Sequence, residues 1–251
     1  MPNMINVTQN ECALELAPKT EENMRETVVQ QGFISEESLK GLEYRDVSRL
    51  SYYGWKRVLD VILAILALLF LAVPMLCLAA LVFIDEPGNV IFTQYRVGRN
   101  GQLFKLYKFR TMKAKTPKYM ATNEMHDPGQ YITKVGRVLR KLSLDELPQL
   151  INVIKGDMSL VGPRPLIPSE REIHTMRNDY GVYTARPGVT GLAQINGRDL
   201  VSPAEKVRWD VKYLECFSLI QDLQILIQTV PKVFGCSDVV EGANPTDTEK
   251  E

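Results

Sequence analysis

The sequence predicts a helix-rich α+β protein of the monotopic membrane class, with a proline-broken re-entrant membrane helix hairpin and a small cytosolic domain. Three observations predict this class. Residues 61–84 form an apolar run without a charge, and Pro74 lies near its middle. Residues 90–109 have the pattern of a short strand pair, and most later segments have helical spacing.

The apolar run is long enough for a membrane helix, because a crossing needs about 20 apolar residues. It begins too late in the chain for a signal peptide, and no small-residue cleavage site follows. Pro74 removes one helical hydrogen bond and clashes with the preceding turn. Positive charges flank both ends of the run and mark the cytoplasmic side, so re-entrance is favoured over a bent spanning helix, which stays the alternative.

Composition divides the chain into four parts. We expect a polar, largely disordered N-terminal extension at 1–50, with a short helix near 35–42, and a membrane segment at 51–86. A cytosolic domain at 87–238 and a disordered acidic tail at 239–251 follow. The 251 residues carry no net charge and can bury a real core. The four cysteines show no metal-binding spacing, which indicates reduced thiols.

The domain begins with two predicted strands at 90–98 and 103–109, joined by a turn with the sequence GRNG. A loop at 113–130 leads to helical spacing at 136–140 and 144–154, and Gly156 should end the second of these helices.

Two more helices are predicted nearer the C-terminus. Ser202, Pro203 and Glu205 form a capping box with proline at the first helical position. Residues 218–235 form an amphipathic segment whose apolar face belongs either to the core or to the membrane surface.

Adjacent carboxylates at Asp145 and Glu146 are the strongest chemical signal. One interpretation is structural: Ser143 and Glu146 have capping-box spacing, and Asp145 before Pro148 is another candidate cap. The other is chemical: a carboxylate at a helix N-terminus stays ionised and can attack phosphorus. The two interpretations are compatible.

Fixed cations near such a carboxylate would favour a phosphorylated substrate. Arg164 lies between two prolines, Arg186 precedes Pro-Gly and Arg198 follows Asn-Gly, and Lys108 and Arg110 lie on the second strand and at its end. Each arginine alone is typical of a surface ion pair. Their recurrence in rigid loops predicts a phosphate-binding site, because the guanidinium fork matches phosphate oxygens.

The order of these motifs resembles the bacterial sugar transferase family, the monotopic polyprenyl-phosphate phosphoglycosyltransferases. The similarity spans residues 52–235. It is carried by Lys56-Arg57-x-x-Asp60, the apolar run with Pro74, 108-KFRTM-112, 143-SLDELPQL-150, 155-KGDMSLVGPRP-165, 186-RPGVTGLAQINGR-198 and 210-DVKYLECFSLIQDLQIL-226. Where family members often have serine before the membrane proline, this chain has Val73.

The resemblance implies an enzyme that moves sugar-1-phosphate from a UDP-sugar to a polyprenyl phosphate such as undecaprenyl phosphate, releasing UMP. Asp145 would be the nucleophile that carries a phosphosugar. Asp145 and Glu146 would bind Mg²⁺, or Glu146 would instead position the acceptor phosphate. Arg164 and Arg186 match the family's phosphate-binding arginines. The step would begin an exopolysaccharide, a capsule, the O-antigen of a lipopolysaccharide or a glycoprotein glycan.

The resemblance also implies a location: the bacterial inner membrane, with the catalytic domain on the cytoplasmic face and in contact with membrane lipids. We expect no nucleic-acid partner, and a homodimer is one expected state. Two other functions remain open. A membrane-anchored binding module would grip anionic lipids through its basic face, and an ordinary glycosyltransferase would release UDP rather than UMP.

Overall fold

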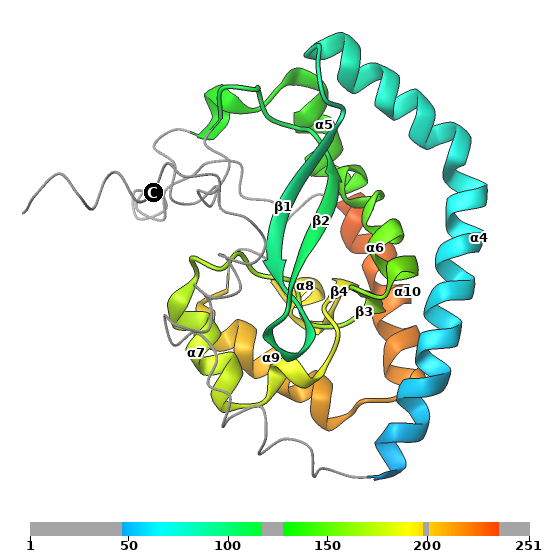
Figure 1. The fold of residues 1–251 in the computed structure, drawn as a ribbon, viewed down its shortest axis with the longest axis vertical. Helices are drawn as coiled ribbons and strands as arrows, with labels where there is room; N and C mark the ends of the chain where they lie inside the picture. Colours follow the sequence, from blue (N-terminus) through cyan, green and yellow to red (C-terminus); the bar gives the residue numbers. More distant parts are fainter. Residues whose placement is uncertain (1–46, 117–127, 198–200, 236–251) are drawn as a thin grey trace, which may run out of the picture.

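The computed structural model describes residues 47–116, 128–197 and 201–235, and within them the protein is a helix-rich α+β molecule (Figure 1). The α-helices are α4 (Val47–Asp85), α5 (Lys134–Lys141), α6 (Gln149–Lys155), α7 (Arg171–Asp179), α8 (Leu192–Ile195), α9 (Pro203–Glu215) and α10 (Leu219–Gly235). The strands are β1 (Ile91–Val97), β2 (Leu103–Phe109), β3 (Ser159–Val161) and β4 (Gly188–Thr190). The predicted helix near 35–42 and the acidic tail lie outside the described residues.

Helix α4 is continuous through Pro74, and Figure 1 shows it bending partway along as it passes the rest of the molecule. Proline lacks the N–H of the helical hydrogen bond and crowds the preceding turn, which is the usual origin of such a bend. By length and composition, Tyr53–Asp85 is able to cross a membrane. The predicted apolar segment therefore forms a bent continuous helix rather than two helices separated by a break.

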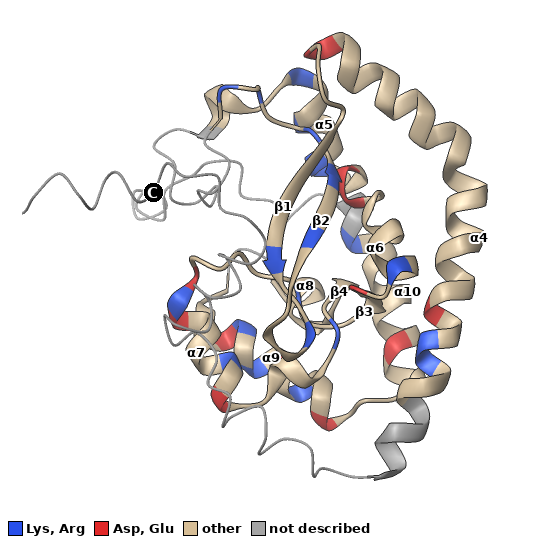
Figure 2. Cartoon of the chain, in the orientation of Figure 1, with Lys and Arg blue, Asp and Glu red and all other residues tan. Residues whose placement is uncertain are grey.

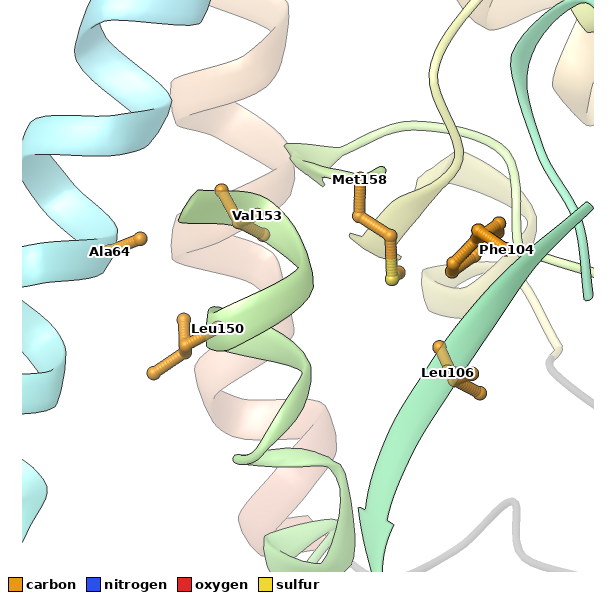
Figure 3. Close-up of a cluster of buried hydrophobic side chains, with 6 residues drawn as sticks. All are labelled: Ala64, Phe104, Leu106, Leu150, Val153 and Met158. Carbon is orange, nitrogen blue, oxygen red and sulfur yellow. The ribbon is translucent and has the colours of Figure 1, made fainter. Parts of the chain in front are cut away.

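The inner face of α4 packs against the domain along both halves of the helix. Figure 3 shows the first contact, where Ala64 points toward Leu150 and Val153 of α6, with Met158 lying between α6 and β2. Further along, the buried Val82 joins a second cluster with residues of β2 and α5. The helix is thus fastened to the domain over its whole length.

The outer face of α4 is apolar and exposed. The large exposed side chains are Trp55, Val58, Ile62, Leu63, Ile65, Leu66, Leu69, Phe70, Val73, Leu76, Leu81, Phe83 and Ile84. A contiguous apolar surface of this length is costly in water and marks a membrane or protein contact. The helix therefore fits a membrane anchor.

Polar side chains fix both ends of α4 to the same domain. Near its start, Lys56 forms a buried ion pair with Asp222 of α10. At its end, a carboxylate oxygen of Asp85 accepts a hydrogen bond of 2.8 Å from the backbone N–H of Val135 in α5. The domain therefore contacts the helix before and after the bend.

The predicted hairpin is confirmed, with β1 and β2 antiparallel and Ile91 opposite Phe109. Its turn places Asn100 in the left-handed region, at φ 53°, which asparagine tolerates better than most residues. The capping box at Ser202 and Glu205 and the helix end at Gly156 are also confirmed. These three features are encoded within a few residues of chain.

A small parallel sheet joins β3 to β4 and was not predicted from the sequence. The loops beside these strands pass so closely that a Cβ on Gly162 would lie 2.4 Å from the carbonyl oxygen of Arg186. A Cβ on Gly188 would lie 2.1 Å from the backbone nitrogen of Gly162. The two glycines therefore allow the segment that carries Arg164 to pass close beside the segment that carries Arg186.

Candidate active site

The two carboxylates predicted to be catalytic lie in a 3-10 turn, Leu144–Glu146, between α5 and α6. Asp145 is buried, with 7% of its surface exposed. Ser143 adopts a left-handed conformation and its side chain forms no capping hydrogen bond. Helix α6 starts only at Gln149. The capping interpretation is therefore wrong, because neither Ser143 nor Asp145 begins the helix.

Two predicted cations lie against this pair. The Nζ atom of Lys108 is 2.8 Å from Oε1 of Glu146 and 3.9 Å from Oδ2 of Asp145. A guanidinium nitrogen of Arg164 is 3.3 Å from the same Glu146 oxygen. Figure 2 shows basic segments of β2 and α5 beside the acidic turn that precedes α6. The fold thus brings Lys108 and Arg164 together with the carboxylates.

A buried ion pair holds the backbone of Arg164. Arg177 of α7 and Asp210 of α9 form an ion pair of 2.7 Å, and both side chains are almost entirely buried. Arg177 also donates a hydrogen bond of 2.7 Å to the carbonyl oxygen of Arg164. Together with the close passage at Gly162, these contacts fix the position from which the Arg164 side chain reaches Glu146.

Burial raises the pKa of the Asp145 carboxyl above its ordinary value, because the charged form loses its hydration. Lys108 opposes this change most strongly, and the negative charge of Glu146 adds to it. Arg140 and Arg164 also lower the pKa of Asp145. The ionised form thus depends on surrounding cations rather than on the helix N-terminus expected from the sequence.

Two further arginines, Arg140 and Arg96, lie at this site and were not predicted from the sequence. Arg140 lies in the last turn of α5 and acts on Asp145, and Arg96 of β1 lies near Glu146 and Arg164. Both belong to basic clusters visible in the sequence. Nothing in those clusters distinguishes the members that face the carboxylates, because that depends on how the hairpin packs against the 162–165 segment.

The other predicted site residues lie elsewhere. Arg110 donates to the carbonyl oxygen of Glu86, beyond the end of α4. Arg186 donates a hydrogen bond of 3.1 Å to the carbonyl oxygen of Gly156, at the opposite end of α6 from Asp145. Arg198 lies outside the described residues. Pro74 lies within α4, as expected for a residue that shapes the membrane helix.

The carboxylate pair also offers the donors that a magnesium ion requires. Mg²⁺ is commonly bound through one or two carboxylates together with substrate phosphates and water. Asp145 and Glu146 provide two adjacent carboxylates and fit this mode. Among the described residues, no group of three or more His, Cys, Asp and Glu side chains could form a site made by the protein alone.

These features suit nucleophilic attack on an anionic substrate. A buried carboxylate is a potential nucleophile, and the cations around it can stabilise charge on phosphate oxygens. The site lies directly before α6, a helix that packs on α4. The site is therefore held close to α4.

Comparison with known proteins identifies a family that matches most of the chain. The family model for bacterial sugar transferases matches residues 51–236. The chain is 42% identical over 192 residues to the exopolysaccharide production protein ExoY of Sinorhizobium fredii, covering 71% of this chain and 84% of the relative.

Two further relatives have names that state a reaction. The UDP-glucose:undecaprenyl-phosphate glucose-1-phosphate transferase of Caulobacter vibrioides is 41% identical over 186 residues, 71% of this chain and 69% of the relative. The undecaprenyl-phosphate galactose phosphotransferase of Salmonella typhimurium is 38% identical over 192 residues, 71% of this chain and 40% of the relative. With its matched region including the membrane helix, the carboxylate pair and the arginine loops, the chain belongs to the bacterial sugar transferase family.

Proposed function

We propose that this enzyme transfers sugar-1-phosphate from a UDP-sugar to a polyprenyl phosphate, such as undecaprenyl phosphate, and releases UMP. The observation that carries the proposal is the buried Asp145 beside Glu146, Lys108 and Arg164, on a turn next to the helix that fits a membrane anchor. The names of the Caulobacter and Salmonella relatives support this reaction class. The name of the ExoY relative supports a role in starting an exopolysaccharide.

The proposed reaction has two steps. A carboxylate oxygen of Asp145 attacks the phosphorus that bears the sugar, the bond to the oxygen shared with the nucleotide breaks, and UMP leaves with the bonding electrons. An oxygen of the polyprenyl phosphate then attacks the same phosphorus and releases the carboxylate. Lys108 and Arg164 stabilise the negative charge that both steps place on the phosphate oxygens.

Magnesium fits this proposal as a cofactor held by Asp145 and Glu146. When bound, it would supply positive charge to the phosphate oxygens of the substrates. In the structure Lys108 and Arg164 already contact Glu146, so the protein itself supplies part of that charge. Chelation with EDTA should abolish turnover, and added Mg²⁺ should restore it.

We propose that α4 is re-entrant and that the domain lies on the cytoplasmic face. The attachment of both α4 ends to one domain supports this topology. In a spanning arrangement the domain would have to follow α4 through the bilayer, carrying the basic α5 into or across the hydrocarbon. That is costly, because each buried charge or unpaired backbone group costs several kcal/mol.

The outward side of α10 supports the same arrangement. Its exposed apolar side chains are Leu219, Ile220, Leu223, Ile227 and Val230, which share one stripe of the helix. The buried pair of Lys56 and Asp222 joins α10 to the start of α4. We infer that this stripe lies in the membrane surface, which is one of the two alternatives that the sequence left open.

The products of the reaction test the proposal. Membranes containing the protein are incubated with a panel of labelled UDP-sugars, with and without polyprenyl phosphate. We expect UMP and a lipid-linked diphosphate sugar, both dependent on the acceptor. Release of UDP would instead indicate an ordinary glycosyltransferase, and an absence of turnover with every donor would favour a binding module.

A further inference from the structure

One arginine beside the carboxylate pair lacks a counterion. Arg96 of β1 donates to two neutral oxygens, the carbonyl oxygen of Pro165 at 3.3 Å and the side-chain oxygen of Gln94 at 2.7 Å. Its Nε atom is buried and has no hydrogen-bond partner among the described residues. Within the described part of the chain, no carboxylate forms an ion pair with it.

The charge of Arg96 is retained at neutral pH although its surroundings oppose it. Burial, and to a smaller extent the neighbouring charge of Arg164, lower the pKa of this guanidinium to about 10. The carboxylates of Glu170 and Glu146 act in the opposite direction from beyond ion-pair distance. A pKa of about 10 still leaves the group protonated, so a partly desolvated cation lies next to a second cation.

A desolvated guanidinium beside a second cation is unfavourable unless an anion compensates its charge. A buried charge normally has a partner, and a buried donor without an acceptor costs about 1–3 kcal/mol. By contrast, Arg177 in the same fold has a carboxylate counterion, Asp210, at 2.7 Å. The two hydrogen bonds that Arg96 does make need only a neutral donor, so they do not explain a guanidinium at this position.

We propose that Arg96 binds phosphate oxygens of a substrate together with Arg164, so that the site holds its ligand between two guanidinium groups. The inference rests on the proposed function and adds a substrate-binding residue to it. The guanidinium has more N–H donors than the two that bond Pro165 and Gln94, and those left over, the Nε–H among them, can serve the ligand. An anion between the two arginines would also remove their mutual repulsion.

The position of Arg96 favours the diphosphate of the nucleotide donor over the phosphate of the lipid acceptor. Arg96 comes from β1, and in Figure 1 β1 lies farther from α4 than β2 does. The acceptor phosphate is tethered to a lipid chain and must stay near α4. A soluble nucleotide sugar can approach from the side of the hairpin that is away from the membrane.

Steady-state kinetics of Arg96→Gln and Arg96→Lys test this inference, with donor and acceptor varied separately. Losing a charge-assisted hydrogen bond should raise the donor KM about 10- to 100-fold in the glutamine variant, with the acceptor KM unchanged. Lysine keeps the charge but not the fork, so its donor KM should rise by a smaller factor. Lys105→Gln is the matched control, because Lys105 is an exposed cation on the other face of the same hairpin.

A rise in the acceptor KM alone would assign Arg96 to the lipid phosphate instead. Donor and acceptor KM values within twofold of the unaltered enzyme for both variants would overturn the proposal. If the glutamine variant does not fold, the lysine variant decides, and a donor KM within twofold overturns the proposal.

Equilibrium binding of UDP in an Asp145→Asn background separates this inference from the covalent mechanism. Adding Arg96→Gln there should weaken UDP binding about tenfold or more, whether or not Asp145 is the nucleophile. Unchanged UDP affinity in that background, with an unchanged acceptor KM, would contradict the role of Arg96 and leave the proposed reaction standing.

Discussion

At the scale of single residues, Asp145 combines two properties that oppose each other. Its burial favours the neutral acid, while Lys108, Arg140 and Arg164 favour the carboxylate. Phosphate oxygens of a bound substrate would draw on the same cations. The charge of the proposed nucleophile thus depends on side chains from β2, α5 and the 162–165 segment.

Replacing Asp145 by asparagine should abolish transfer, because the amide has nearly the same shape but cannot form the phosphosugar ester. Loss of a nucleophile typically costs several powers of ten, so the rate should fall below about one thousandth. Radiolabelled product formation in membranes measures it. Asp157→Asn serves as the control, since Asp157 pairs with Lys155 beyond the other end of α6. A rate above about one tenth for Asp145→Asn would argue against covalent catalysis.

His174 gives a second prediction at this scale. It is fully buried, and its Nε2 lies 2.8 Å from the carbonyl oxygen of Ile167, just after the loop that carries Arg164. Burial, and to a smaller extent the charge of Arg177, lower the pKa of this imidazole to about 4.

The unfolded chain therefore takes up a proton near pH 6.5, before the folded protein does. The stability that the neutral imidazole contributes is present above pH 6.5 and is lost as the pH falls toward 4, by about 3 kcal/mol in total. Thermal unfolding in detergent between pH 7 and 4.5 should show this decline. His174→Gln should show a shallower one, and identical pH profiles would refute the assignment.

At the scale of elements, the position of the site follows from helices that local sequence specifies and from strands that it does not. The hairpin, the α9 capping box and the end of α6 could be predicted, because a turn, a cap and a glycine act within a few residues. The β3–β4 pair could not, since each strand has only three residues and its partner lies far along the chain.

The capping prediction at the site failed for the same reason, because packing between distant segments overrides local spacing. Ser143 has capping-box spacing, yet it takes a left-handed conformation because the chain turns between α5 and α6 before α6 begins. Arg186, which lies in a rigid Pro-Gly context, donates to the carbonyl oxygen of Gly156 rather than facing the carboxylates, and its role in binding phosphate stays a prediction. Which arginine faces the carboxylates is decided by packing between distant segments, and residue spacing does not report it.

Helix α10 provides the prediction for this scale. A polarity-sensitive fluorophore attached to Ile227→Cys, in a protein whose native cysteines are replaced by serine, should report an apolar environment in bilayers. The same fluorophore on Gln228→Cys is the control, because that position is exposed and points away from the stripe. Equally polar signals from both positions would exclude the stripe from the membrane surface.

At the scale of the whole molecule, the bent α4 is packed against the domain on both sides of its bend. The helix packs on α6 in one hydrophobic cluster and shares a second cluster with residues of β2 and α5, so the carboxylate turn between α5 and α6 is held next to α4. In the proposed reaction, this arrangement would let a lipid phosphate and a soluble nucleotide sugar reach Asp145.

The topology of α4 can be tested in intact cells with a membrane-impermeant maleimide. Cys12 precedes α4 and the exposed Cys216 follows it, so a re-entrant helix places both thiols on the cytoplasmic side. Neither peptide should be labelled before permeabilisation, and both should be labelled afterwards. Labelling of Cys12 alone in intact cells would show that α4 spans the membrane.

The most direct test of the account is the mass of the enzyme during turnover. The protein is mixed with its UDP-sugar donor without acceptor, quenched in acid and digested, and the peptide that contains Asp145 is weighed. We predict an added sugar phosphate on Asp145 that disappears when polyprenyl phosphate is supplied. An unmodified Asp145 peptide, under conditions where product forms once acceptor is added, would contradict the covalent mechanism.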